Sequence, residues 1–270
     1  MAHKNKQSVA LILGSAFEGS FAGELNLMAH EIHTEFGTVT IHQTTLRSDR
    51  NAYVLFRHGL PHRLLPNQIN YRAQALALKN LNCGALLINS SVGVMDAGLP
   101  LYKPMLVTDL MMPENRLPDG STCTMFPDPS PGHGHLLIKD GLFSSELNRR
   151  LQREHKNDIH NADDGVVFVF AGGPRGKTPA ENRMWAKLGG QVNSMTLAPE
   201  VVLANELEIA AAALVVGHKY SVPDVENPKQ EEIADTLANA RTATEKILKS
   251  FLLEGEPAEF QNQIYRFTDE

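Results

Sequence analysis

The residues of this sequence best suited to chemistry are an arginine and a histidine that stand side by side at the end of a short apolar run. In "YVLFRHG", Arg57 and His58 follow a segment with the composition of a buried strand, and Gly59 ends it. Arginine presents a planar fork of N–H donors that matches phosphate, and histidine adds another donor. The pair therefore predicts an anion site, although a strand end solvated by water is the alternative interpretation.

Three further strand ends carry hydroxyl groups close to glycine. These hydroxyls are Ser15 in "GSAFEGS", Ser90 and Ser91 in "NSSVG", and Thr196 in "NSMTLAPE". Taken singly, each has an ordinary explanation: a strand-to-helix turn or, for Thr196, the cap of a helix through 201–207. Because ligands bind at strand ends in open α/β sheets, the hydroxyls together with Arg57 and His58 predict one phosphate pocket assembled from distant segments.

Short apolar runs alternate with longer amphipathic segments, which predicts an α/β fold. The predicted strands are 8–14, 52–56, 84–89, 105–111, 165–172 and 211–217, and the predicted helices are 67–80, 143–155, 178–190 and roughly 228–253. Continuously apolar strands suit a sheet covered by helices, so we expect a single domain over 1–270. The long Pro/Gly-rich connection 112–135 is expected to be functional or disordered rather than a domain boundary.

The composition limits the possible partners. Lys and Arg total 25 against 31 Asp and Glu, a formal net charge of −6, which gives no general attraction to nucleic acid polymers or anionic membranes. The two cysteines, Cys83 and Cys123, have neither metal-type spacing nor a disulfide framework. No apolar run is long enough for a signal peptide or a membrane helix, so we expect a cytoplasmic protein.

Two long stretches resemble the trimeric purine nucleoside phosphorylase family, and more closely its 5′-methylthioadenosine phosphorylase branch. They are "RHGLPHRLLPNQINYRAQALALKNLNCGALLINSSVG" and "GGPRGKTPAENRMWAKLGGQVNSMTLAPEVVLANELEI". The resemblance covers most of the chain in a consistent order. It implies a mixed, partly barrel-like sheet surrounded by helices, assembled as a homotrimer. It also implies cleavage of the purine–ribosyl bond by inorganic phosphate, with phosphate as co-substrate and no metal or organic cofactor.

The resemblance also implies roles for individual residues. Ser15, Arg57, His58, Ser90 and Thr196 match the phosphate-binding set, Ser91 adds a backbone contact near the ribose, and Met195 packs beneath the sugar. Tyr71 stands in the family's "NY" motif, and His135 matches loosely a histidine that one subunit lends to its neighbour's site. Because phosphate is the nucleophile, we expect Arg57→Ala to abolish phosphate-dependent cleavage while leaving the fold intact.

The sequence departs from the family where the purine is bound. In "GHKYS", His218, Lys219 and Ser221 replace the family's acid- or amide-containing motif. A lysine has only hydrogen-bond donors, so Lys219 suits an O6 or N7 acceptor and predicts weak activity on adenine nucleosides relative to 6-oxopurine ones. The alternative is that Lys219 faces solvent or pairs with a carboxylate, with Asp224 serving after a loop shift.

A second departure lies in "GPRGK". Gly176 replaces the aromatic residue that stacks on the base, and Lys177 stands where the 6-oxopurine enzymes carry glutamate. The leading interpretation is a phosphorylase for a purine nucleoside or a 5′-methylthio nucleoside, with Lys219 and His218 acting on the base. Two alternatives stay open: a non-catalytic relative that binds phosphate or a sugar phosphate, and a hydrolase, against which Arg57 and His58 argue.

Overall fold

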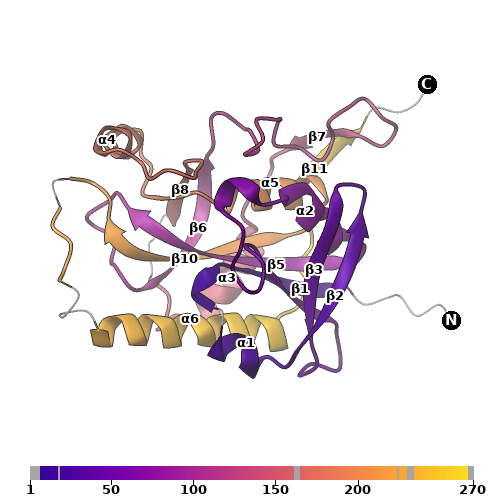
Figure 1. The fold of residues 1–270 in the computed structure, drawn as a ribbon, viewed down its shortest axis with the longest axis horizontal. Helices are drawn as coiled ribbons and strands as arrows, with labels where there is room; N and C mark the ends of the chain where they lie inside the picture. The colour runs from indigo at the N-terminus through magenta and orange to yellow at the C-terminus, as the bar shows by residue number, and fades with distance from the viewer. Residues whose placement is uncertain (1–6, 18, 161–164, 224, 230–233, 267–270) are drawn as a thin grey trace.

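The computed structural model describes residues 7–17, 19–160, 165–223, 225–229 and 234–266 (Figure 1). Within them, a nine-stranded mixed sheet is surrounded by helices. Each predicted strand is present: β1 (Ser8–Leu13), β4 (Ala52–Phe56), β5 (Cys83–Val94), β6 (Pro104–Met111), β8 (Val166–Phe170) and β10 (Ala211–Tyr220). The prediction of a mixed α/β fold is therefore confirmed.

Strands that the sequence does not predict complete the sheet. They are the antiparallel hairpin β2 (Leu27–Thr34) and β3 (Gly37–Thr44), and the short β9 (Val192–Ser194). Two more, β7 (Gly134–Leu137) and β11 (Gln263–Arg266), form a separate antiparallel pair. Only Val39, Ile41 and Thr44 of this hairpin are buried, so it lacks the continuous apolar run by which the buried strands are found.

Part of the sheet closes on itself. The strand order is β10-β6-β8-β9-β5-β1-β4-β3-β2, and β10 also pairs with β5. The first five strands thus form a ring, which is the barrel-like part of the fold, and β1, β4, β3 and β2 extend from it. Strand β5 belongs to both parts.

The two edges of β5 are occupied differently. One edge pairs with β10 from Leu86 to Val94. The other pairs with β1 up to Ile88 and with β9 only from Gly93 onward. Between these two ladders, residues 89–92 have no strand partner on that edge among the described residues. The opening falls on the predicted anion-binding motif.

Helices cover both faces of the sheet (Figure 1). α2 (Tyr71–Asn80) and α5 (Ala198–Glu206) pack on one face, and α1 (Ser20–Glu24), α3 (Ser145–Glu154) and α6 (Ala234–Glu254) lie on the other. The strands are apolar throughout because their side chains alternate between two core clusters. In β1, Ala10 and Ile12 join the cluster under α2 and α5, whereas Val9 and Leu11 join the cluster against α6.

The helix boundaries follow their capping residues. The predicted box at 178–190 is present in α4 (Pro179–Lys187), where the Thr178 hydroxyl accepts from the Glu181 backbone and the Glu181 carboxylate accepts from the Thr178 N–H. The helix predicted at 67–80 is instead the turn η2 (Pro66–Gln68) followed by α2. Asn70 caps α2 by accepting from the Ala73 N–H, 3.1 Å away.

The long connection 112–133 contains neither helix nor strand, but polar contacts hold it in place. The Arg72 guanidinium on α2 donates to the carbonyls of Thr122 and Thr124 at 2.9 and 2.8 Å. The Thr124 hydroxyl in turn donates to the Glu206 carboxylate on α5. Among the described helices, none is long and apolar enough to cross a membrane.

Candidate active site

A cavity of about 340 Å³ opens at the unpaired edge of β5. Most of the predicted site residues line it: Arg57, His58, Ser90, Ser91, Gly176, Met195, Thr196, His218, Lys219 and Ser221. They come from segments more than 160 residues apart in the sequence. The strand ends that the sequence analysis singled out therefore meet at one place.

Arg57 forms the floor of one end of the cavity. Its side chain is 1% exposed, and its Nε and Nη2 donate to the two carboxylate oxygens of Glu200 at 2.5 and 2.8 Å. Its Nη1 donates to the Asn89 carbonyl, 3.1 Å away, on the unpaired edge of β5. One N–H on each of the two terminal nitrogens is left over, so the fork is fixed in orientation while still able to donate to an anion.

Glu200 is a functional residue that the sequence reasoning missed. It lies in the first turn of α5, is 3% exposed, and balances the charge of Arg57. The signal was a glutamate at the start of a mostly apolar helix, since such a residue is almost never buried without a partner.

His58 stands beside Arg57 with its ring orientation fixed. Its Nδ1 lies 2.8 Å from the Leu64 carbonyl, and the ring stacks on that of His62 with 4.4 Å between centroids. Nδ1 must carry a proton to donate to a carbonyl, so Nε2 is the acceptor in the neutral ring. Burial, with smaller contributions from Arg57 and His62, lowers the pKa of His58, which favours this neutral form.

The hydroxyls of Ser90 and Thr196 meet across the cavity. Their oxygens are 3.4 Å apart, and the Ser194 hydroxyl is also 3.4 Å from that of Ser90. The alternative interpretation of Thr196 as a helix cap is wrong. The N-cap is Leu197, which has a left-handed φ of 79° and makes no side-chain cap bond. This costly backbone conformation turns the chain between β9 and α5, and the Thr196 hydroxyl meets Ser90 instead.

The opposite end of the cavity is held by a chain of buried amides. Asn193 Nδ2 donates to Asn182 Oδ1 at 3.1 Å, and Asn182 Nδ2 donates to the Ser221 carbonyl at 2.8 Å. These bonds join β9, α4 and the segment after β10. The sequence reasoning missed both asparagines, because an asparagine that only links segments leaves no motif.

A β-bulge brings His218 and Lys219 to the same cavity. Gly217 of β10 pairs with Val92 of β5, and Lys219 pairs with the next residue, Gly93, so His218 is the extra residue. Successive side chains of a regular strand point to opposite faces, whereas a bulge re-aims them. Both residues consequently line the open cavity and are exposed, whereas a regular strand would present only one of the two side chains to it.

Four predicted residues require separate comment. Tyr71 is 2% exposed in a core cluster with Met125, so it is a core residue here and not part of the cavity wall. His135 is exposed on β7, paired with Tyr265, and does not line the cavity.

Ser15 begins the turn η1 (Ser15–Phe17), whose neighbouring Gly14 and Ala16 line the cavity, but its side chain lies outside what the structure describes. Asp224 is also outside the described residues.

A neighbouring cavity of about 500 Å³ shares Lys177 with the first. It lies between the connection after β6 and α4, and it contains none of the predicted phosphate-binding residues. Gly176 stands at the boundary, with nothing within 4 Å of where a side chain would begin. The missing aromatic side chain therefore leaves the base end of the smaller cavity open.

Comparison with known proteins gives a consistent result. Residues 8–253 match the family model described as the phosphorylase superfamily. The chain is 35% identical over 193 residues to a probable S-methyl-5′-thioinosine phosphorylase of Methanopyrus kandleri, covering 70% of this chain and 71% of that protein. It is 30% identical over 185 residues to a probable 6-oxopurine nucleoside phosphorylase of Moorella thermoacetica, covering 67% and 68%.

The fold agrees with these matches. The methylthioadenosine phosphorylase of Schistosoma mansoni, solved in complex with adenine, superimposes with a TM-score of 0.74 over 90% of this chain and 89% of that one, at 22% identity. The match of the family model covers nearly the whole chain and includes the segments that build the cavity. This chain therefore belongs to the phosphorylase superfamily.

Proposed function

We propose that the protein cleaves a purine nucleoside, or its 5′-methylthio analogue, with inorganic phosphate as the nucleophile. The products are the free base and ribose 1-phosphate or its 5-thio analogue. The observation that carries the proposal is the meeting of Arg57, His58, Ser90 and Thr196 at one end of a single cavity. The family and the names of the relatives support the same reaction.

The proposed reaction needs no protein nucleophile. Hydrogenphosphate, oriented by Arg57 and the Ser90 and Thr196 hydroxyls, attacks the anomeric carbon while the bond to N9 breaks and its electron pair passes to the purine. The hydrogenphosphate gives up one proton and the departing purine takes up one, so the proton count balances. His58 Nε2 is the acceptor at the phosphate end, and the ammonium of Lys219 is a donor at the base end.

The base end favours a 6-oxopurine over adenine. Lys219 lines the cavity, and an ammonium can donate to O6 or N7 but cannot accept from a 6-amino group. The names of two relatives, a thioinosine phosphorylase and a 6-oxopurine nucleoside phosphorylase, agree with this preference.

The alternative of a non-catalytic relative is disfavoured by the position of Lys219. A protein that only held phosphate would have no use for a bulge that brings His218 and Lys219 to the cavity. A hydrolase is disfavoured by Arg57 and His58, since water as nucleophile needs no anion clamp.

Incubation of the purified protein with inosine, adenosine and 5′-methylthioadenosine, with and without phosphate, tests the proposal. We expect free base and a sugar 1-phosphate only when phosphate is present, with inosine cleaved faster than adenosine. Cleavage without phosphate would contradict the phosphorolytic assignment. Efficient cleavage of methylthioadenosine would contradict the role given to Lys219.

We further propose a cytoplasmic homotrimer in which His135 serves a neighbouring subunit. The exposed position of His135 on β7, outside the cavity of its own chain, supports this arrangement. The two described cysteines are free and buried, which suits a reducing compartment. The mass of the protein in solution tests the trimer, and a monomeric active enzyme would contradict it.

A further inference from the structure

The base end of the cavity is unusually rich in positive charge. Lys177, Lys219 and His218 line it, and none of the described residues lining the cavity is an aspartate or a glutamate. The buried Glu200 is already bound through both carboxylate oxygens to Arg57. Among the described residues, the wall where a purine would bind therefore offers cationic donors and no carboxylate to balance them.

Neither lysine is neutralised by a residue within the described part of the chain. Among the described residues, no hydrogen bond or ion pair within 4.0 Å involves the ammonium of Lys177 or of Lys219. The nearest acid in sequence to Lys177 is Glu181, whose carboxylate receives two hydrogen bonds from Arg175 at 2.9 and 2.6 Å. The hydrogen bonds from Arg175 are the largest reason that the pKa of Glu181 is lowered to about 2. This carboxylate is therefore already paired with Arg175.

The two lysines also act on each other. Burial and then the charge of Lys219 lower the pKa of Lys177 to about 8, against a smaller opposing effect of Glu181. Burial and the charges of Lys219 and Lys177 likewise lower the pKa of His218. Like charges gathered in one cavity are unfavourable until an anion occupies it.

The phosphate is not the anion that these lysines fit. Lys219 pairs with Gly93 of β5, three residues beyond Ser90, which places the two positions roughly 10 Å apart along the strand. Residues of both ends line the same cavity, as do Ser194 and Met195. One end is thus built for phosphate and the other for a second negatively charged group.

We propose that the base end is built for a purine that is itself an anion, a 2,6-dioxopurine nucleoside, with Lys177 and Lys219 donating to its two exocyclic oxygens. This inference rests on the proposed function and narrows its substrate class. A 2,6-dioxopurine loses a ring proton near neutral pH and spreads the charge over both oxygens, whereas a 6-oxopurine stays neutral and has one such oxygen. A 6-amino group offers only donors to the two ammonium groups.

The test compares kcat/KM for xanthosine, inosine and adenosine in the presence of phosphate. We expect xanthosine to be preferred over inosine by about tenfold at neutral pH, the effect of one additional hydrogen bond to a charged group. Lys177→Met should remove most of this preference while changing inosine cleavage less, whereas Lys219→Met should remove the preference and also slow inosine cleavage, because Lys219 donates to either base. Lys187→Met, an exposed lysine on α4 outside the cavity, is the matched control and should keep the preference.

Two further readouts separate this inference from a structural effect. The xanthosine preference should decline as the pH rises through about 8, because Lys177 then loses its proton, and Lys177→Met should lack this decline. Removing either like charge should leave the melting temperature unchanged or raise it. Failure of the variants to fold would therefore contradict the proposed repulsion.

The cleavage assay distinguishes failure of the inference from failure of the proposed function. Cleavage of inosine without a xanthosine preference would overturn the inference and leave the function in place. Absence of any nucleoside cleavage would overturn the function. Calorimetry would then still test the base end, which should bind free xanthine more tightly than hypoxanthine and lose that difference in Lys177→Met. Equal binding of the two bases would overturn the inference.

Discussion

Arg57 is both the cation of the proposed phosphate end and one of the largest fully buried side chains described. The expectation that Arg57→Ala would leave the fold intact did not take its partner into account. Removing the guanidinium leaves the Glu200 carboxylate buried and unpaired, and breaking a buried ion pair in this way typically costs about 3–5 kcal/mol. A loss of activity in that variant would consequently mix a binding effect with unfolding.

A double substitution separates the two effects. We predict that Arg57→Ala lowers the free energy of unfolding by about 3–5 kcal/mol, whereas Arg57→Met combined with Glu200→Leu stays within about 1–2 kcal/mol of the wild type, because apolar residues of similar size often replace a buried pair at little cost. Urea denaturation measures both. The folded double variant should lack phosphate-dependent cleavage, and retained turnover in it would remove Arg57 from the site.

At the scale of elements, the buried strands could be predicted from the sequence, whereas the hairpin, the short β9 and the bulge in β10 could not. Six buried strands were found from their continuous apolar runs because the sheet is covered on both faces. The hairpin of β2 and β3, which is buried at only three positions, and the three-residue β9 carry no such run. The bulge at His218 was also invisible, since it is a property of the register between β10 and β5 and not of the residues of β10 alone.

Glycine at position 93 is required by the segment that follows the bulge. A Cβ atom there would lie 2.1 Å from Ser221 Oγ and 3.3 Å from Ser221 Cβ. We predict that Gly93→Ala destabilises the protein by about 1–3 kcal/mol, the usual cost of overpacking, and raises the KM for the nucleoside by displacing Ser221. Combining it with Ser221→Ala should restore part of the stability, and strictly additive losses in a double-mutant cycle would contradict the contact.

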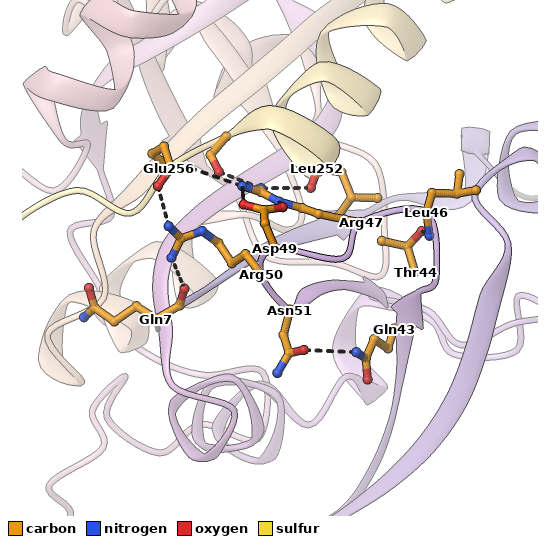
Figure 2. A network of polar contacts seen from close by, with 11 residues as sticks. Gln7, Gln43, Thr44, Leu46, Arg47, Asp49, Arg50, Asn51, Leu252 and Glu256 are labelled. Atoms are coloured by element: carbon orange, nitrogen blue, oxygen red, sulfur yellow. Dashed lines mark hydrogen bonds and ion pairs between the residues drawn. The ribbon is translucent and has the colours of Figure 1, made fainter. Parts of the chain in front are cut away.

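At the scale of the whole molecule, Arg47, in the loop between β3 and β4, binds the segment that follows α6 (Figure 2). Its side chain is 3% exposed and donates to the Gly255 carbonyl at 2.7 Å, to Asp49 at 2.9 Å and to Glu256 at 3.2 Å. Glu256 also pairs with Arg50, which donates to the Gln7 carbonyl. The start of β1, the loop before β4 and the end of α6 are thereby joined.

We predict that Arg47→Met lowers the free energy of unfolding by about 2–4 kcal/mol, because it leaves the buried carbonyl of Leu252 and the partly buried carbonyl of Gly255 without their donor. The kcat should be unchanged, since Arg47 does not line the cavity. Arg153→Met is the control: its ion pair with Glu154 is exposed and should contribute less than about 1 kcal/mol. Equal losses in the two variants, measured by urea denaturation, would show that the Figure 2 network is not stabilising.

The residues of the candidate site that face the cavity, and their meeting at one place, were predictable, whereas the residues that hold them in position were not. Arg57, His58, Ser90 and Thr196 were found because their chemistry stands out at strand ends. Glu200, Asn182 and Asn193 were missed because each acts on another protein group and not on a ligand. Tyr71 was misplaced because a motif indicates proximity to a site, whereas packing decides whether the side chain reaches it.

The bond between Arg57 and Glu200 joins residues 143 positions apart. During synthesis on the ribosome, the guanidinium must therefore stay hydrated until α5 has left the exit tunnel. A chain cut short before that point cannot bury the end of β4 and exposes apolar strands to chaperones and proteases. The ion pair at the end of β4 is thus completed only after most of the chain has been synthesised.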